Sequence, residues 1–536
     1  MKSLIILFAD NFSNFGFENS FGGKSAFDKT LEWAKNVKTA SKIEVFCHES
    51  NKALVEKSAE SGISVKSKAC WTNEELFAEI SDSLNKGDAD YALFSFAFNP
   101  FINQTLTEKL IATHEKFRSE YSFADGYPVS VSPEILDKGL VKILSELIKT
   151  KDELKNAPVT KSSVFDLIKT DINSFEIETE ISTTDWRLYR FDFSCDKKEN
   201  YIACTKLYEK VQALNETEKN DIQKICEVAS KEVKVLKTIP GYFNIQICKD
   251  YQSKSQYCAY SLFGNTIKEN MSFENFKLLV KKINDFNPDA VVSLSLWGDP
   301  VVHPDFFDFV NEVLNYPGLT VLVETDGFDF TKPDFNSENS EGRNKLKALS
   351  DKVSRMGKRK NGYSPVLWIV NVDAMTQKTY EEIHPGLKLD NAVASIKLLQ
   401  SLFEGSVYSQ FLRILKNEEE LESFYRTYKE KDFISAGNFI ITKYDHFCKK
   451  LPEIKSADLS PIDRNPCWHL RRDFNVLADG SVPVCREKSF ETACGNGISQ
   501  DLETVWAEID SAMQKDIEKK YCEGCSCCDE YYTYNF

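Results

Sequence analysis

The chain has 536 residues, which is too long for one hydrophobic core and predicts several domains. Its net charge of -15 argues against a nucleic-acid or anionic-membrane partner, because binding to phosphates needs clustered Lys and Arg. No stretch has the roughly 18 uncharged apolar residues of a membrane span, and the opening run MKSLIILFAD reads as a strand rather than a signal peptide. We therefore expect a cytoplasmic protein whose partner is a small molecule or a peptide.

The first 155 residues alternate between strand-like and helical patterns. Apolar runs at 4–8, 43–47 and 91–96 are separated by helical segments, and this alternation predicts an α/β domain over residues 1–155. A Lys-rich polar stretch near residue 150 is typical of a linker, and residues 156–238 form an intermediate region without a clear pattern.

Alternation resumes after residue 239. Strand-like runs at 243–248, 291–296, 319–324 and 366–372 are separated by helical segments such as 273–286. Repeated strand–helix units of this length predict a parallel sheet or partial barrel over 239–445, with ligands bound at the carboxyl ends of the strands.

The first loop of this region, in FNIQICKDYQSKSQYCAY, resembles the cluster-binding loop of radical SAM enzymes, where a strand leads into Cys-x3-Cys-x2-Cys. The three ligand positions are Tyr251, Ser255 and Cys258, so that one thiol is left. A phenol and a hydroxyl are poor ligands for soft iron, and we therefore expect no reductive cleavage of S-adenosylmethionine. Cys248 is expected to pack in the strand.

Two later strand ends also resemble radical SAM enzymes. SLSLWGDPVVHPDF contains Gly298, Asp299 and Pro300 at the family's Gly-Glu-Pro position, and ETDGF contains Thr325 at the Thr-Asn-Gly position. The resemblance implies that Cys258, Gly298, Asp299 and Thr325 mark a degenerate S-adenosylmethionine site, in which Asp299 is one methylene shorter than the usual Glu. The alternative is that the glycines and prolines only shape turns after strands.

The amino-terminal domain resembles sugar-nucleotide cytidylyltransferases and related GT-A-type nucleotidyltransferases, through FGGKSAFDKTLEWA and YALFSFAFNPFINQ. Phe98 and Asn103 stand at the family's two metal-binding carboxylate positions. A divalent cation that bridges nucleotide phosphates needs hard anionic oxygens, which neither side chain provides. We expect this domain to have lost nucleotidyl transfer.

Fifteen cysteines in a reducing compartment are not expected to form disulfides. Five are scattered and are expected to be buried: Cys47, Cys70, Cys195, Cys204 and Cys226. Near the carboxyl end, 12 residues separate Cys467 from Gly480 and four separate Gly480 from Cys485. This spacing resembles the opening of a SPASM domain, and Asp479-Gly480 predicts a hairpin turn that brings the two thiols together.

The tail YCEGCSCCDEYY contains two overlapping Cys-x2-Cys pairs, Cys522 with Cys525 and Cys525 with Cys528. We favour Cys525 and Cys528 as ligands, with Cys527 as a spare thiol and Cys494 in the core. Four thiolates from this set and the hairpin suit either a 4Fe-4S cluster or a structural zinc ion. The SPASM resemblance favours the cluster.

Taken together, these segments resemble the spiro-SPASM family over essentially the whole chain. The resemblance implies a GT-A/nucleotidyltransferase-like α/β domain, a radical SAM-like partial (β/α) barrel over 239–445 and a small cysteine-rich SPASM domain over 446–536. Because both upstream sites have lost ligands, we predict an iron–sulfur protein whose other domains are non-catalytic or repurposed scaffolds. The alternatives are a radical SAM enzyme that modifies a peptide or a sugar nucleotide, and a zinc-stabilised interaction protein.

Overall fold

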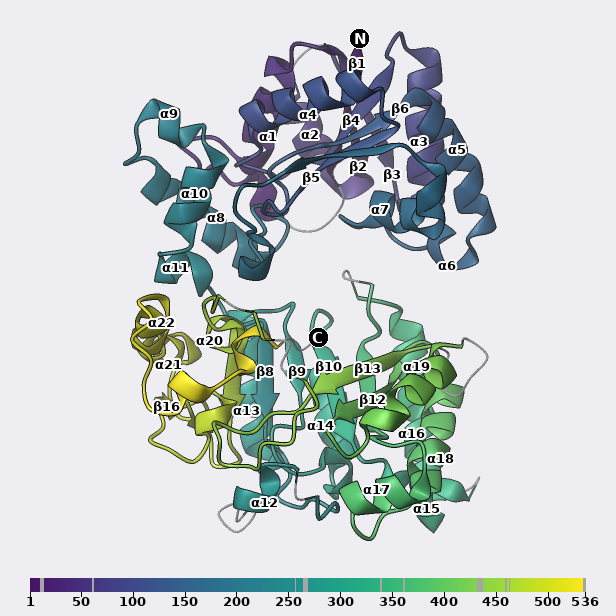
Figure 1. Ribbon diagram of the computed structural model, residues 1–536, viewed down its shortest axis with the longest axis vertical. Helices are drawn as coiled ribbons and strands as arrows, with labels where there is room; N and C mark the ends of the chain where they lie inside the picture. The colour runs from purple at the N-terminus through teal and green to yellow at the C-terminus, as the bar shows by residue number, and fades with distance from the viewer. Residues whose placement is uncertain are drawn as a thin grey trace. The chain divides into compact units, whose positions relative to one another are not determined.

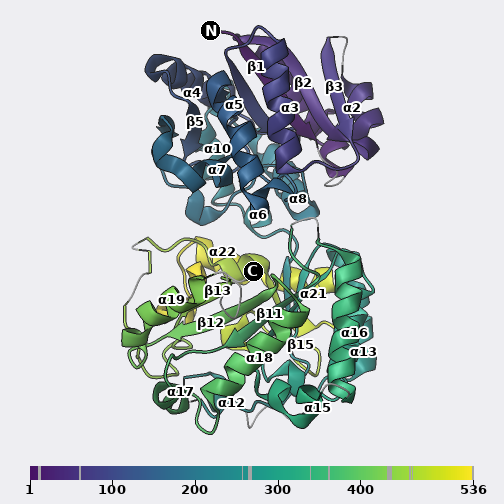
Figure 2. The ribbon, with the colours of Figure 1, turned by 90° about the vertical axis from the view of Figure 1, so that its right-hand side faces the viewer.

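Figures 1 and 2 show a computed structural model of the chain. It describes residues 1–9, 14–59, 62–255, 257–263, 269–337, 340–359, 362–430, 437–457, 460–461 and 463–533. The chain forms two compact units, Met1–Thr238 and Ile239–Phe536. None of the described helices is both long and apolar enough to cross a bilayer.

The first unit contains a seven-stranded mixed sheet with the order β3-β2-β1-β4-β6-β5-β7. Its strands are β1 Ser3–Ala9, β2 Ala40–His48, β3 Ile63–Lys68, β4 Tyr91–Phe96, β5 Tyr121–Asp125, β6 Glu134–Asp137 and β7 Ile177–Ile181. Its α-helices are α1 Ala26–Asn36, α2 Lys52–Ser58, α3 Asn73–Lys86, α4 Gln104–Phe117, α5 Lys138–Leu147, α6 Asp152–Lys155, α7 Ser163–Ile168, α8 Lys198–Val211, α9 Glu216–Lys219, α10 Ile222–Ala229 and α11 Val233–Leu236.

The centre of this sheet is buried on both faces. All seven residues of β1 are buried, as expected for a parallel strand that is covered by helices on each side. Helices α3 and α5 pack their apolar side chains on one face. Helices α1 and α3 each begin with a capping box, Ser25 with Asp28 and Thr72 with Glu75, which fixes where these helices start. The intermediate region 156–238 belongs to this unit, since β7 pairs with β5.

The second unit contains a seven-stranded parallel sheet with the order β13-β12-β11-β10-β9-β8-β14. Its strands are β8 Tyr242–Ile245, β9 Val291–Ser293, β10 Thr320–Thr325, β11 Val366–Asn371, β12 Val407–Arg413, β13 Phe439–Lys443 and β14 Asp473–Val476, and a separate antiparallel pair is β15 Ser481–Val482 with β16 Gly495–Asn496. Its α-helices are α12 Tyr260–Phe263, α13 Phe273–Phe286, α14 Phe306–Leu314, α15 Pro333–Asn336, α16 Glu341–Met356, α17 Gln377–Ile383, α18 Leu389–Leu402, α19 Leu421–Lys429, α20 Trp468–Arg472, α21 Leu502–Glu508 and α22 Asp510–Ile517.

The predicted α/β fold class is confirmed in both units, and the predicted helix over 273–286 is α13. The carboxyl-terminal segment is not a separate compact unit, because β14 adds an edge strand beside β8. The turn at Gly480 is present, with φ +86° and a hydrogen bond of 2.9 Å from Leu477 N to Ser481 O. The strands on either side of this turn pair elsewhere, β14 with β8 and β15 with β16.

The expectation for the scattered cysteines is right for Cys47, Cys195, Cys204 and Cys226, which are buried. It is wrong for Cys70, which is exposed. Cys70 lies in the connection between β3 and α3, outside the layers that bury the other four. Cys248 is 1% exposed, as expected of a residue that follows a central strand.

Candidate metal centre

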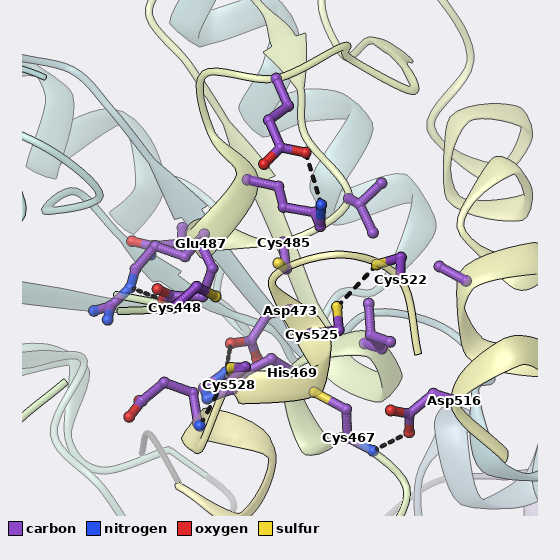
Figure 3. A pocket seen from close by; sticks show the side chains of 18 of the residues that line it. Cys448, Cys467, His469, Asp473, Cys485, Glu487, Asp516, Cys522, Cys525 and Cys528 are labelled. Carbon is purple, nitrogen blue, oxygen red and sulfur yellow. Dashed lines mark hydrogen bonds and ion pairs between the residues drawn. The ribbon is translucent and has the colours of Figure 1, made fainter. Parts of the chain in front are cut away.

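Six cysteines line one cavity of about 400 Å³ in the second unit: Cys448, Cys467, Cys485, Cys522, Cys525 and Cys528. Figure 3 shows their thiols around the same space. One wall of the cavity is the sheet itself, through Tyr242 and Asn244 of β8, Ser293 of β9 and Glu324 of β10. The thiols therefore face a cavity that reaches the strands of the parallel sheet.

Two of the thiols stand at helix starts on either side of the Gly480 turn. Cys467 directly precedes α20, and its backbone N–H donates a 2.7 Å hydrogen bond to Asp516 Oδ2 of α22. Cys485 directly precedes a 3-10 helix, Arg486–Lys488. Gly480 is required at the turn, because a Cβ there would lie 2.7 Å from the Asn496 side chain and φ is positive. The sequence prediction that this turn brings Cys467 and Cys485 to one site agrees with the cavity that both line.

The tail thiols are held by Arg464. Its Nη1 donates to Cys525 O at 2.6 Å and to Cys528 O at 3.5 Å, and its guanidinium stacks on the rings of Tyr521 and Tyr531. The Tyr521 and Tyr531 rings therefore flank the tail cysteines and anchor the segment that carries them. Cys522 is exposed, whereas Cys525 and Cys528 are half-buried.

The thiols that line the cavity differ in the direction in which their pKa is shifted. Burial raises the pKa of Cys467 and of Cys485 well above the usual range, and it raises the pKa of Cys525 to about 12. Cys528 differs, since a hydrogen bond with Cys448 lowers its pKa. The thiolate is the form that binds metal, so that occupation of this site by a metal would release protons from the buried thiols.

Four buried polar atoms of residues that line the cavity lack hydrogen-bond partners among the described residues: Asn244 Oδ1, Arg464 Nε, His469 Nε2 and Glu487 Oε2. Two of them, His469 Nε2 and Glu487 Oε2, are of a type that binds metals. His469 is oriented from its other nitrogen, because Nδ1 is 2.6 Å from Asp473 Oδ2. A buried polar atom without a partner costs about 1–3 kcal/mol, so such atoms are expected where a ligand completes the site. The thiols and these two atoms fit a metal-containing group.

Cys448 was missed by the sequence prediction. It lies 19 residues before Cys467 and has no cysteine neighbour at a Cys-x2-Cys spacing, so no motif includes it. Its position inside the 446–536 segment was the only available signal. Cys494 does not line the cavity and is half-buried, and the Cys527 thiol donates to the carbonyl oxygens of Cys448 and Gly524.

A second group of ligand-type side chains, Asp445, His446 and Asp529, has ligand atoms within 4.8 Å of one another among the described residues. Cations already neutralise its carboxylates. Asp529 forms ion pairs with Lys443 and Lys455, and Asp445 forms one with Arg486. These contacts explain the group as a network of charged side chains.

The residues predicted to mark a degenerate S-adenosylmethionine site lie after β8 and β9 and at the end of β10. Thr325 Oγ1 donates a 2.7 Å hydrogen bond to Asp299 Oδ2, which also accepts from Asp326 N, and Asp299 Oδ1 accepts from Val301 N. Asp299 is 2% exposed, so its carboxylate accepts hydrogen bonds from protein groups rather than from solvent. Gly298 has φ +77°, and a Cβ there would lie 2.4 Å from Cys248 O. The backbone conformation and this close contact are therefore enough to require glycine at this position.

The loop that carries Tyr251, Ser255 and Cys258 is fixed by side-chain hydrogen bonds. Tyr251 Oη donates to Asp326 Oδ1 at 3.3 Å, and burial raises the pKa of Cys258 to about 11. Ser253 Oγ is 2.9 Å from His384 Nδ1, and His384 Nε2 is 2.7 Å from Asp373 Oδ2. The loop therefore holds Tyr251 and Ser253 in hydrogen bonds, to Asp326 and His384 respectively, and carries one thiol, Cys258, at the three predicted ligand positions.

In the first unit, Phe98 and Asn103 have structural roles. The Phe98 ring packs 5.1 Å from the Phe17 ring, and a Cβ on Gly16 would lie 2.2 Å from it. Asn103 Oδ1 accepts from Leu106 N at the start of α4, and its Nδ2 donates to Asn220 O. Neither residue presents an anionic oxygen.

Solved structures similar to the chain come from two groups. AnSMEcpe with bound AdoMet and Cp18Cys peptide has a TM-score of 0.38 at 14% identity and covers 55% of this chain and 91% of its own. BtrN in complex with AdoMet and 2-DOIA has a TM-score of 0.34 at 16% identity, covering 55% and 94%. A cytidylyltransferase from Leptospira borgpetersenii has a TM-score of 0.35 at 17% identity, covering 44% and 97%.

No family model matches the chain. A curated protein of Treponema pallidum (strain Nichols), itself uncharacterized, is 34% identical over 385 residues, which are 70% of this chain and 99% of that protein. A second uncharacterized protein of the same organism is 42% identical over 48 residues, 9% of this chain and 22% of that protein. Because the first match covers nearly the whole relative, the chain belongs to the same family as this Treponema pallidum protein.

Proposed function

We propose that this chain is an iron–sulfur protein. In this proposal the cysteine-lined cavity holds a 4Fe-4S cluster, and the parallel sheet and the amino-terminal unit act as binding scaffolds rather than as catalysts. When bound, such a cluster supplies one-electron redox chemistry whose potential depends on charge, burial and hydrogen bonds to sulfur.

The observation that carries this proposal is the convergence of six thiols on one cavity of about 400 Å³. Soft thiolates suit iron–sulfur clusters and zinc alike, so spacing has to decide between them. Zinc at about 2.3 Å from each sulfur requires thiols about 3.8 Å apart in a tetrahedron. Among the described residues, the group of three or more ligand-type side chains whose ligand atoms all lie within 4.8 Å of one another is Asp445, His446 and Asp529, so no three cavity thiols approach one another that closely. This wider spread of thiols favours a cluster over one zinc ion.

The parallel sheet of the second unit supports a scaffold role, because the carboxylate at its predicted cofactor site is already hydrogen-bonded to other groups of the protein. The Asp299 carboxylate accepts hydrogen bonds from Thr325, Asp326 and Val301. Tyr251 and Ser255 stand where the resemblance places thiolates, and burial keeps the one remaining thiol, Cys258, protonated at neutral pH, with its pKa at about 11. Reductive cleavage of S-adenosylmethionine needs an open iron site that this loop does not build.

The amino-terminal unit supports the same conclusion. Nucleotidyl transfer needs carboxylates that hold a divalent cation, and the two positions carry a buried phenylalanine and a helix-capping asparagine, Phe98 and Asn103. The partner of the protein is proposed to be a small molecule or a peptide that enters the cavity between the thiols and the sheet residues Tyr242 and Glu324.

The test is anaerobic purification of the full chain with analysis of iron, acid-labile sulfide and zinc, followed by electron paramagnetic resonance of the reduced protein. About four iron atoms and four sulfides per chain are expected. One zinc and no iron would overturn the iron–sulfur proposal. The same sample, reduced with dithionite, is expected to give no 5′-deoxyadenosine from S-adenosylmethionine, and product above a cluster-free control would overturn the scaffold role of the barrel.

A further inference from the structure

Cys448 is presented to the cavity by an unusual turn. Phe447, Cys448 and Lys449 are three consecutive non-glycine residues with positive φ, at 49°, 53° and 64°. A left-handed L-residue costs about 1–2 kcal/mol, so three in succession persist only where the surroundings fix them. Phe447 provides this constraint, because its side chain is fully buried and its ring lies 5.7 Å from that of Trp297. The turn aims the Cys448 thiol at the other cavity thiols.

The tail closes around Cys448. The Cys527 thiol donates to Cys448 O at 3.5 Å. Gly524, with φ +84°, packs against the Cys448 side chain, since a Cβ on Gly524 would be 3.7 Å from Cys448 Sγ. Two separate segments of the chain, the 447–449 turn and the tail, therefore bring Cys448 and Cys528 to the same cavity, and Figure 3 labels both.

Cys522 and Cys525 are arranged differently. Their sulfur atoms are 3.2 Å apart, closer than the about 3.8 Å that separates two thiolates on one tetrahedral metal. Cys522 is also exposed, whereas the other five cavity cysteines are half-buried. This contact is that of a dithiol at the rim of the cavity rather than of two ligands.

Cys467, Cys485 and Cys528 all line the cavity and come from three segments of the chain. A 4Fe-4S cluster held by these three thiols needs one more ligand, and Cys448 and Cys525 are the candidates.

We propose that Cys448, Cys467, Cys485 and Cys528 are the four cluster ligands and that Cys522 and Cys525 form a separate dithiol at the rim. This inference rests on the proposed iron–sulfur function. It replaces Cys525, which the sequence pattern favours, by a residue that no motif contains. The reason is that a constrained turn presents Cys448 to the cavity, whereas the Cys525 thiol lies 3.2 Å from that of the exposed Cys522.

The test is thiol alkylation of the intact, anaerobically purified chain, read by peptide mass spectrometry before and after removal of iron with a chelator. Before removal, iodoacetamide is expected to modify Cys522 and Cys525 and to leave Cys448, Cys467, Cys485 and Cys528 unmodified. After removal all six are expected to react. Alkylation of Cys448 in protein that keeps its full iron content would overturn the inference.

A pair of matched variants gives a second readout. Cys448→Ser is expected to lower iron from about four atoms per chain to below one, and Cys525→Ser is expected to keep the wild-type content. The reverse pattern would overturn the inference while leaving the iron–sulfur function in place. Absence of iron from the wild-type chain would instead overturn the proposed function itself. The alkylation experiment uses the wild-type chain, so it decides the matter even where a variant fails to fold.

Discussion

Replacing Asp299 tests whether the barrel retains a working cofactor site. The carboxylate accepts from Val301 N at 3.1 Å, from Thr325 Oγ1 at 2.7 Å and from Asp326 N at 3.3 Å. Asp299→Ala leaves these donors buried without an acceptor. The Thr325 hydroxyl can rotate towards another acceptor, but the two backbone N–H groups cannot, and each costs about 2 kcal/mol. The expected loss in the free energy of unfolding is about 4 kcal/mol.

The assay is urea unfolding of the full chain, followed by tryptophan fluorescence, to which the buried Trp297 and Trp368 of the second unit contribute. With a slope of about 3 kcal/mol per molar urea, the midpoint is expected to fall by about 1 M. Asp299→Asn is the matched control. It keeps an acceptor for Val301 N and loses the bond from Asp326 N, so a loss of about 2 kcal/mol is expected.

The same variants distinguish a structural carboxylate from a ligand-binding one. Equilibrium dialysis is expected to detect no retention of S-adenosylmethionine by the wild-type chain or by either variant. The reasoning is refuted if the wild-type chain binds the cofactor and Asp299→Ala abolishes binding while the unfolding curve stays unchanged. That result would mean that the carboxylate is available to a ligand and does not hold the loops after β9 and β10.

Three further predictions concern other parts of the chain. Cys528→Ser is expected to remove the visible absorption and the iron, and Cys522→Ser to keep both; iron lost with Cys522 and kept without Cys528 would contradict the ligand assignment. Burial raises the pKa of Glu134 to about 7 from an ordinary 4.5, and Tyr121 donates a hydrogen bond to its carboxyl group. The stability that the protonated carboxyl provides is therefore full below pH about 4.5 and is lost as the pH rises through about 7. Glu134→Gln should therefore stabilise the chain by at most about 3 kcal/mol at pH 8 and by little at pH 4, and an equal effect at both pH values in thermal unfolding would count against it. Finally, the chain is expected to release no pyrophosphate from CTP or UTP with magnesium, because Phe98 occupies a carboxylate position, and turnover with any sugar phosphate would show that the loss is compensated.

Much of the fold could be predicted from the sequence because its signals are local. The apolar runs at 4–8, 91–96 and 366–372 correspond to β1, β4 and β11, and the helix over 273–286 is α13. Strand and helix periodicity, capping residues and turn glycines act within a few residues of one another. The spacing of Cys467, Gly480 and Cys485 is local in the same way, and both thiols line one cavity.

Other features depend on segments far apart in the chain. Asp473–Val476 reads as one arm of a hairpin, yet it pairs with Tyr242–Ile245, more than two hundred residues earlier, and so joins the carboxyl-terminal segment to the sheet. In the sequence Asp299 resembles a ligand shortened by one methylene. Its hydrogen bond from Thr325 depends on the ends of β9 and β10 lying side by side in the sheet.

Local patterns in the sequence predict the strands, the main helices and a cysteine-rich carboxyl-terminal segment, and the family resemblance implies lost ligands at Tyr251, Ser255 and Phe98. Which thiols share a cavity depends on the folded chain. Cys448 enters that cavity through a left-handed turn held by the packing of Phe447 against Trp297, and Cys522 turns towards Cys525 at the rim. The physical reason is that local propensity fixes an element within a few residues, whereas the meeting of side chains from four segments is fixed by the packing of the whole unit.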